Sequence, residues 1–247
     1  MKRYIVFVIA LCFSCTSSDE TPPENGVLLK KIIETFEGSE PQTTVYHYNG
    51  NKLVEAVNED DDHKLVYSYA GNLLTRISYR NLGGTEYTRH DLTYDDSQRL
   101  IKHSSKNSWA ENPNYIQYTH NADGTVLAVS HFWDDFELEY SIDSQKIFFE
   151  NGNVIKTENY LPAGIRTSLY SYDDNPNPYR NIRGFDKLLT FDLSVNNCIS
   201  QTVTAPDGST LVQSGTAFTY DQGAYPVSSF RTGIGVGNDK TTAYFYQ

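Results

Sequence analysis

A three-residue pattern built around tyrosine recurs along the chain and constrains its fold more than any other feature. An aromatic or aliphatic residue is followed by a polar residue and then, in most copies, by tyrosine, after which the chain enters a turn rich in Gly, Asn and Asp. We call this pattern the cassette. Its copies are Tyr46–Tyr48, Tyr67–Tyr69, Leu92–Tyr94, Ile116–Tyr118, Leu138–Tyr140, Tyr170–Tyr172, Phe191–Leu193 and Phe218–Tyr220. Successive copies lie 21 to 32 residues apart, a period that indicates an array of one repeated supersecondary unit.

The alternation within the cassette predicts β-strands. Side chains alternate between the two faces of a strand, so the outer residues of each cassette share one face and the polar residue between them points the other way. Asn49–Gly50 is the dipeptide that favours a two-residue type I′ hairpin turn, and three other dipeptides carry the same chemistry. These are Asp123–Gly124, Asn151–Gly152 and Asp207–Gly208. We therefore expect an all-β protein of repeated antiparallel hairpins, a long meander sheet that is curled or closed into a barrel-like shape.

The N-terminus follows a different pattern. A basic start (Met1–Arg3) precedes an apolar stretch (Tyr4–Phe13) that is too short to span a bilayer, and Ser14 and Cys15 follow. This arrangement resembles a bacterial lipoprotein signal, in which cleavage occurs before a cysteine that then carries the lipid. The small side chain of Ser14 suits the residue before the cut, whereas lipidation at Cys12 would place Leu11 there. An ordinary cleaved secretory signal is the alternative interpretation.

These features predict three segments. Residues 1–14 form a lipoprotein signal peptide, residues 15–26 contain the lipidated cysteine and a disordered polar tether, and residues 27–247 form a single β-repeat domain. The acidic run Ser17–Glu20 resembles the short signal that directs lipoproteins of Bacteroidota to the outside of the outer membrane, although a plain solvated linker would have the same composition. We expect a lipid-anchored protein of the outer membrane, either on the cell surface or facing the periplasm.

Charge and cysteine content narrow the possible partners. The chain has a formal net charge of −11, and removal of residues 1–14 leaves 18 basic against 31 acidic residues, a net charge of −13. Nucleic acid is excluded because its recognition needs a basic surface. The same charge argues against peripheral binding to anionic lipid, so membrane contact is assigned to the lipid on Cys15. Cys198 would be the only cysteine left after processing, which leaves no partner for an intramolecular disulfide and suggests a small core residue.

Two segments in the later part of the chain resemble a known family. The segments Tyr172–Tyr179 (YDDNPNPY) and Phe218–Pro226 (FTYDQGAYP) resemble a family of Bacteroidota lipoproteins of unknown function, described as porin-like in fold. The cassette itself is similar to the tyrosine–aspartate repeats of bacterial cell-surface proteins. The resemblance implies a many-stranded antiparallel sheet curled into a barrel-like shape. It implies no activity, and the polar residues inside the cassettes argue against an apolar band around a membrane pore.

Residues suited to catalysis or metal binding are scarce. The six histidines are scattered singly, with no spacing suited to zinc, and we expect neither a metal nor a cofactor. The acidic run Glu59–His63 has carboxylates for calcium but lacks the ligand spacing of a calcium loop, which favours a charged hairpin tip. Trp109 and Trp133 are the candidate ligand-binding residues, because exposed aromatic rings on a rigid sheet suit stacking on sugars or docking of a protein. A core position is the alternative for both.

Two functions remain open. The sequence favours a non-catalytic, lipid-anchored envelope protein that binds a glycan or an envelope protein, or that serves as a structural module. The alternative is an envelope polysaccharide hydrolase, which would need two carboxylates facing one cleft.

Overall fold

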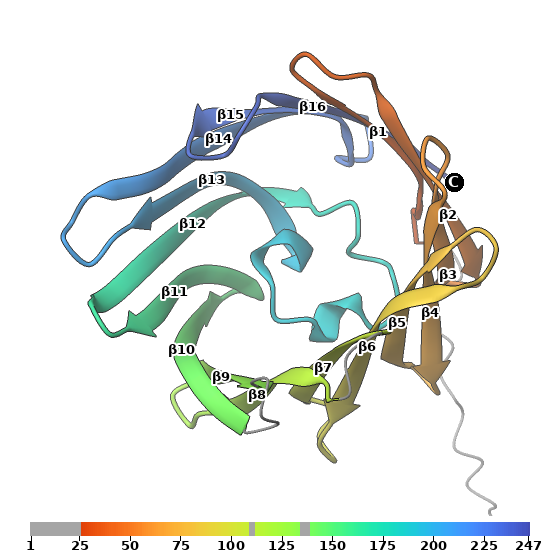
Figure 1. The fold of residues 1–247 in the computed structure, drawn as a ribbon. Helices are drawn as coiled ribbons and strands as arrows, with labels where there is room; N and C mark the ends of the chain where they lie inside the picture. The colour runs from red at the N-terminus through yellow and green to blue at the C-terminus, as the bar shows by residue number, and fades with distance from the viewer. Residues whose placement is uncertain (1–25, 109–111, 134–138) are drawn as a thin grey trace, which may run out of the picture.

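The protein forms a closed β-barrel. The computed structural model describes residues 26–108, 112–133 and 139–247. The described strands run antiparallel in chain order around the barrel, and the last strand pairs with the first (Figure 1). The strands are β1 (Leu29–Phe36), β2 (Gln42–Asn49), β3 (Lys52–Asn58), β4 (His63–Ala70), β5 (Leu73–Asn81), β6 (Glu86–Tyr94), β7 (Leu100–Asn107), β8 (Asn114–His120), β9 (Val126–Trp133), β10 (Glu139–Glu150), β11 (Asn153–Leu161), β12 (Gly164–Pro176), β13 (Asn196–Thr204), β14 (Thr210–Tyr220), β15 (Pro226–Ile234) and β16 (Lys240–Tyr246). The expected all-β meander is confirmed, and the sheet closes.

Alternation along the strands separates the lumen from the outer surface. Tyr46 on β2 is buried and faces the lumen, while His47 beside it is exposed on the outer surface. Directly paired residues lie on the same face of a sheet, so the register carries this assignment from strand to strand. Tyr46 pairs with Ala56, and Ala56 pairs with Leu65. The two outer residues of the strand-borne cassettes therefore point into the barrel, except that the cassette Leu138–Tyr140 lies outside the residues whose side chains the structure describes.

The third residue of several cassettes ties neighbouring strands together. Near its first residues, the odd-numbered strand carries a β-bulge, which leaves a backbone carbonyl without a partner in the ladder. A tyrosine hydroxyl on the next strand donates a hydrogen bond to a carbonyl near this bulge. The bonds run from Tyr48 to Leu29 (2.7 Å), Tyr94 to Leu74 (2.7 Å), Tyr172 to Val154 (2.6 Å) and Tyr246 to Pro226 (2.8 Å). In three cassettes, and at Tyr246 in the last strand, the tyrosine thus satisfies a backbone carbonyl, whereas the Tyr69 hydroxyl is buried without a partner among the described residues.

The aspartate that follows a cassette tyrosine shapes the next turn. The Asp95 side chain accepts hydrogen bonds from the backbone N–H groups of Ser97 and Arg99, at 3.0 and 2.9 Å. Asp221 accepts the equivalent bonds from Gly223 and Tyr225, at 2.8 and 2.9 Å. An aspartate side chain that bonds to N–H groups further along the chain stabilises a tight turn. This explains why Tyr and Asp occur together in the repeat.

The two-residue type I′ turn is confirmed at one of the four expected dipeptides. Asp123–Gly124 and Asp207–Gly208 instead lie in five-residue loops in which only the glycine has positive φ. Asn151 and Gly152 both adopt positive φ, 51° and 81°, as a type I′ turn requires. At the first hairpin the prediction was wrong by one residue. Asn49 pairs with Lys52 as the last residue of β2, so the turn is formed by Gly50 and Asn51, and only Gly50 has positive φ. Glycine in the first turn position permits a different two-residue turn of the same length.

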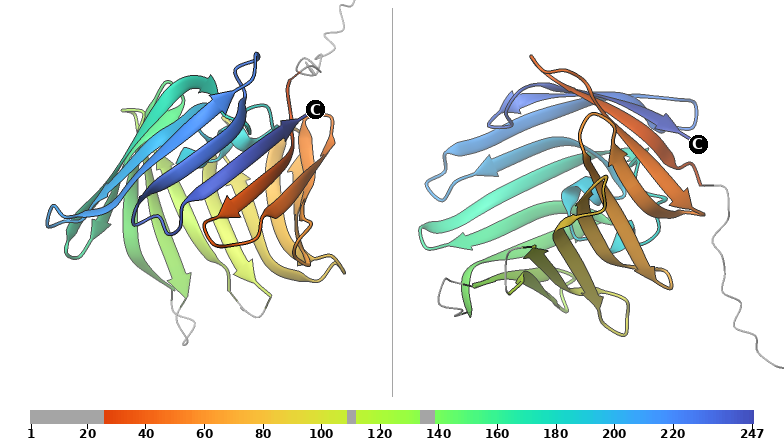
Figure 2. Two further views of the ribbon diagram at one scale, coloured as in Figure 1. Left: turned by 90° about the horizontal axis from the view of Figure 1, so that it is seen from above. Right: turned by 45° about the vertical axis from the view of Figure 1, so that its right-hand side comes forward.

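The connection between β12 and β13 enters the barrel instead of forming a hairpin. This segment, Asn177–Val195, contains the short 3₁₀ helices η1 (Phe185–Lys187) and η2 (Phe191–Leu193) and lies within the ring of strands (Figures 1 and 2). We call it the plug. The expected cassette strand at Phe191–Leu193 is therefore wrong, because these residues form η2. An apolar–polar–apolar triplet is too short to distinguish a strand from one helical turn.

The plug supplies the centre of the hydrophobic core. Ile182 and Phe185 are buried against Leu29, Leu53 and Leu74, which point inward from β1, β3 and β5. A smaller cluster packs under the other side of the plug, from β9 to β11. No helix among the described residues has the length and apolar character needed to cross a membrane.

Candidate functional site

A cavity of about 640 Å³ lies in the lumen between the plug and two groups of strands, β1–β4 and β13–β16. Its wall combines aromatic rings with charged and small polar side chains. The rings come from Tyr46 and Tyr67 on one side, Tyr179 and Phe191 on the plug, and Phe218 on the opposite wall. A volume of this size and a wall of this character are typical of small-molecule sites.

Two acidic and two basic side chains face this cavity. Glu34 on β1 and Lys240 on β16 form an ion pair of 2.5 Å across the seam where the barrel closes. Asp192 comes from η2 of the plug and Arg231 from β15. Burial raises the pKa of the Asp192 carboxyl above its usual value, and the positive charges of Lys240 and Arg231 oppose that rise. Asp192 remains accessible to water, so it faces open lumen although protein surrounds it.

Two polar atoms in the cavity wall are buried without a hydrogen-bond partner among the described residues. They are Oδ1 of Asn197 and Nε of Arg231, one acceptor and one donor. Asn197 is only 1% exposed, and its Nδ2 is already committed to Asp173, Asn175 and Pro176. An unpaired buried polar group costs about 1–3 kcal/mol. Both atoms lie behind the accessible surface of the cavity wall, so the residues line the cavity without presenting these two atoms to it.

The tyrosine hydroxyls around the cavity stay protonated at physiological pH. Burial raises the pKa of Tyr46 and Tyr179, whose hydroxyl oxygens lie 3.3 Å apart, and also that of Tyr244. They therefore act as neutral hydrogen-bond donors and acceptors. The site can stack a ring against an aromatic side chain and bond to hydroxyl groups around its edge, which is the combination that recognises sugars.

Of the residues singled out from sequence, the structure describes Trp133 and Cys198, and only Cys198 lines this cavity. Trp133 is on the outer surface of β9, half-buried, and its Nε1 donates a hydrogen bond of 3.1 Å to the Pro113 carbonyl. Its indole N–H is thus occupied within the fold. Trp109 and Cys15 lie outside the described residues. Cys198 lines the cavity as a half-buried thiol, and burial raises its pKa to about 11, which keeps it in the unreactive protonated form.

The acidic run Glu59–His63 forms the turn between β3 and β4 and uses its carboxylates locally. Asp60 accepts a hydrogen bond from the Thr43 backbone at 2.5 Å, and Asp61 lies 2.9 Å from the His63 ring. Within the described ranges no group of three or more His, Cys, Asp or Glu side chains is placed to hold a metal ion.

Sequence reasoning missed the plug and, with it, Asp192. The polar residue of each cassette was expected on the outer surface, whereas Asp192 points into the lumen because Phe191–Leu193 is helical. A signal was present in the spacing. Without the false copy, Tyr172 and Tyr220 are separated by twice the usual period, which indicates an insertion.

Comparisons with known proteins bear on the fold. No protein-family model matches the chain, and no curated protein sequence matches it. Among solved structures, a porin-like protein from Bacteroides vulgatus matches with a TM-score of 0.60 and 13% identity, over 90% of this chain and 99% of that protein. A porin-like protein from Bacteroides uniformis matches with a TM-score of 0.56 and 13% identity, over 89% of this chain and 96% of that one. At this level of identity the chain shares the fold of these porin-like proteins.

Proposed function

We propose that this chain is a non-catalytic, lipid-anchored protein of the bacterial outer membrane that binds a short oligosaccharide in its barrel lumen. The observation that carries the proposal is the combination of aromatic rings, neutral tyrosine hydroxyls and charged side chains around one cavity of about 640 Å³. Pyranose rings offer both an apolar face for stacking and hydroxyl groups that donate and accept hydrogen bonds. The porin-like neighbours in Bacteroides are consistent with a role in the cell envelope.

Anchoring rests on the signal sequence. Lipid attachment at Cys15 would hold the barrel at the membrane through the tether. Labelling of growing cells with an alkyne fatty acid tests this directly: the native chain and a Cys12→Ser chain incorporate the label, and a Cys15→Ser chain does not. Labelling that persists in Cys15→Ser, or that is lost only in Cys12→Ser, contradicts the assignment.

Ligand binding is tested by calorimetric titration of the purified mature chain with neutral oligosaccharides of two to four hexose units. Thr216 on β14 lines the cavity, whereas Ala217 beside it is exposed on the outer surface. Thr216→Trp would fill the lumen and is expected to weaken binding at least tenfold, while Ala217→Trp, the matched control, leaves it unchanged. Arg231→Gln removes a donor that a ligand would satisfy and is also expected to weaken binding about tenfold or more. Binding that survives Thr216→Trp would place the ligand elsewhere.

One observation favours a second candidate, the envelope polysaccharide hydrolase. The cavity holds two carboxyl groups in different states: Asp192 has a raised pKa and Glu34 is paired with a lysine. Glycoside hydrolysis requires a carboxyl group of raised pKa as the acid and a second carboxyl group that faces the same substrate. Mass spectrometry of the oligosaccharides after incubation separates the two functions. Cleavage that is abolished by Asp192→Asn would establish hydrolysis, and intact oligosaccharides would support binding alone.

A further inference from the structure

The outer surface of the barrel is divided into a charged part and an uncharged part. From Ile165 to Ser171 on β12 and along β13–β16, the residues that point outward are uncharged, and the exposed Asp174 lies beyond them, near the end of β12. We call this outer side of β12–β16 the uncharged face. The basic residues of the same strands, Arg166, Arg231 and Lys240, point into the lumen, as their pairing with Asn159, Thr216 and Arg231 shows.

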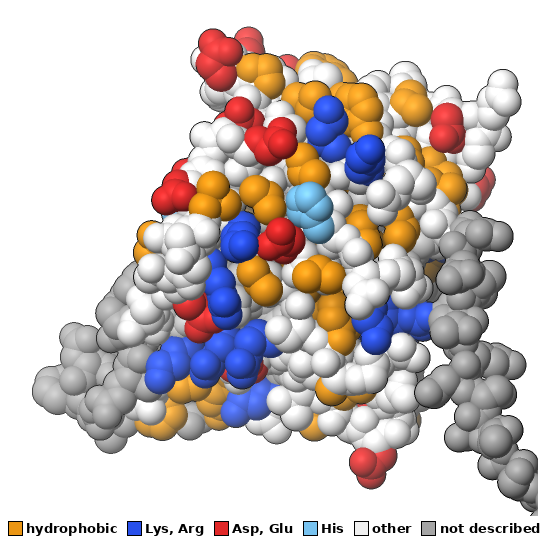
Figure 3. All heavy atoms as spheres, turned by 90° about the vertical axis from the view of Figure 1, so that its right-hand side faces the viewer, with side chains coloured by type: hydrophobic (Ala, Val, Ile, Leu, Met, Phe, Trp, Pro, Cys, Tyr) orange, Lys and Arg blue, Asp and Glu red, His pale blue; other side chains and the backbone are white. Residues whose placement is uncertain are grey.

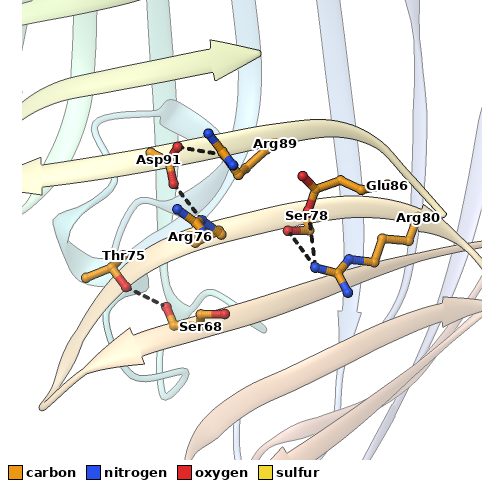
Figure 4. Close-up of polar contacts among 8 residues, drawn as sticks. All are labelled: Ser68, Thr75, Arg76, Ser78, Arg80, Glu86, Arg89 and Asp91. Carbon is orange, nitrogen blue, oxygen red and sulfur yellow. Dashed lines mark hydrogen bonds and ion pairs between the residues drawn. The ribbon is translucent and has the colours of Figure 1, made fainter. Parts of the chain in front are cut away.

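The other side of the barrel has the opposite character. On β5 and β6, Asp91 bridges Arg76 and Arg89 at 2.6 and 2.9 Å, and Arg80 pairs with Glu86 at 3.2 Å (Figure 4). The space-filling view of the side that carries β1–β5 shows basic and acidic side chains spread over the surface (Figure 3). Ion pairs of this kind are suited to water. The two sides of the barrel therefore differ in the charge of their outward-facing side chains.

The uncharged face also exposes large apolar side chains. Ile234 is 70% exposed and Phe230 is 45% exposed, and others of similar exposure lie on each of the five strands. These others include Leu169, Ile199, Leu211 and Phe245. A contiguous exposed surface of this kind marks contact with a partner or a membrane. The cassette pattern did not predict this apolar surface, because most of these residues lie outside the cassettes.

We propose that the uncharged face rests on the surface of the lipid bilayer that holds the acyl chains of Cys15. The proposal relies on the lipid anchor of the proposed function. Only ten residues lie between Cys15 and Gly26, so the barrel cannot move more than about 40 Å from the membrane, given the maximum extension per residue. The tether joins the barrel at β1, which pairs with β16 at the edge of the uncharged face.

Charge favours the bilayer as the occupant of this face. A mature chain of net charge −13 is repelled by anionic headgroups wherever carboxylates lie on its surface, and apart from Asp174 near the end of β12 the outward residues of this face carry none. Lys30 and Lys31 lie where the tether enters β1, and Lys31 stacks on the Phe245 ring, 4.5 Å from its centroid. Two cations beside an apolar surface match the headgroup region of a bilayer. Because the barrel is closed, no unpaired strand edge would be brought into contact with lipid.

Hydroxyl-radical footprinting of the full mature chain tests the orientation. The chain, with Cys198→Ser, is coupled through Cys15 to a maleimide lipid in vesicles of phosphatidylethanolamine and phosphatidylglycerol, so the test does not depend on lipidation in the cell. Phe245 on the uncharged face and Val54 on β3 are both 41% exposed and form a matched pair. Oxidation of Phe245 and Phe230 is expected to fall at least threefold on vesicles, while oxidation of Val54 does not change.

A double substitution, Leu169→Glu with Phe230→Glu, is expected to abolish the protection of Phe245, whereas Val66→Glu on the charged side preserves it. Equal oxidation of Phe245 with and without vesicles overturns the proposal. So does protection of Phe245 that rises with protein concentration in the absence of lipid, since that result assigns the face to a second copy of the chain. Natural lipidation is tested separately, by fatty-acid labelling of the native chain with Cys15→Ser as the control.

Discussion

Single tyrosine hydroxyls hold the repeats together. Tyr94 donates to the Leu74 carbonyl at 2.7 Å, and burial raises the pKa of Tyr94 to about 12, so the proton is retained at any physiological pH. The Leu74 carbonyl lies at a bulge, where the strand ladder does not satisfy it. The aromatic ring and the hydroxyl therefore make separate contributions, one by burial and the other by satisfying a buried acceptor.

We expect Tyr94→Phe to lower the free energy of unfolding by about 1–3 kcal/mol, because the ring is kept while the Leu74 carbonyl loses its donor. Tyr118→Phe is the control, since no hydrogen bond of its hydroxyl is found among the described residues and burial likewise raises its pKa to about 12. Its effect is expected to stay within about 0.5 kcal/mol. Denaturant unfolding followed by circular dichroism measures both values, and equal losses would show that the hydroxyl bond is not responsible.

Two histidines on the lumen side of β6 and β7 predict a pH dependence. His90 Nδ1 and His103 Nε2 share a hydrogen bond of 3.0 Å, and burial lowers the pKa of both rings, with Asp91 opposing the effect at His90 and His90 reinforcing it at His103. The inward residues paired with them, Ile77, Leu92, Ser105 and Ile116, carry no charge.

The unfolded chain binds protons more readily at these two rings, so stability is fully present above the ordinary histidine pKa of about 6.5 and is lost as the pH falls through it. The denaturation midpoint is expected to be lower at pH 5.5 than at pH 7.5. His90→Gln combined with His103→Gln should flatten this dependence. A slope that the double variant leaves unchanged would assign it to other groups.

At the scale of elements, turn chemistry and the plug are linked. Gly152 ends the type I′ turn between β10 and β11, and a Cβ at this position would lie 2.6 Å from Cγ2 of Val195, the last residue of the plug. The turn therefore needs glycine for two reasons, its φ of 81° and the close approach of the plug. Gly124, between β8 and β9, has the same φ of 81° but no neighbouring atom within 4 Å.

This matched pair separates backbone strain from contact with the plug. Gly124→Ala should cost about 1 kcal/mol, the usual penalty for a side chain in the left-handed region. Gly152→Ala should cost at least twice as much, because Val195 must also move. Equal losses of unfolding free energy in the two variants would show that Val195 moves aside without a measurable cost.

At the scale of the whole molecule, closure leaves no edge strand. β1 pairs with β16 from Leu29 to Phe36, and the Glu34–Lys240 ion pair lies across that seam. We expect amide hydrogen exchange in β1 and β16 to be as slow as in strands far from the termini, because every strand has two neighbours. Deletion of residues 240–247 should accelerate exchange in β1 and β15 at least tenfold, as both become edges. Exchange that is fast in β1 of the intact chain would contradict closure.

The sequence predicted the strand class and the inward face, because alternation within each cassette leaves little choice of fold. The side-chain directions of Tyr46 and His47 follow from it. It did not predict closure, since hydrogen bonds between β1 and β16 join residues that are far apart in the chain and leave no local pattern. The lumen site was not predicted for the same reason, because its residues come from separate elements: Glu34, Asp192, Asn197 and Arg231. In addition, the triplet pattern at Phe191–Leu193 wrongly placed Asp192 on a strand.

The position of the plug in the chain sets an order of assembly. Its segment leaves the wall after β12 and returns at β13, so four strands must still be added once it has been made. Arg183 in the plug donates its backbone N–H to the Asn51 carbonyl in the first hairpin, and Asn181 bonds to the Val27 carbonyl. We expect the plug to reach these partners before β13–β16 close the wall, because it precedes these strands in the chain. The last strands to be synthesised would then complete the barrel around an interior that is already packed.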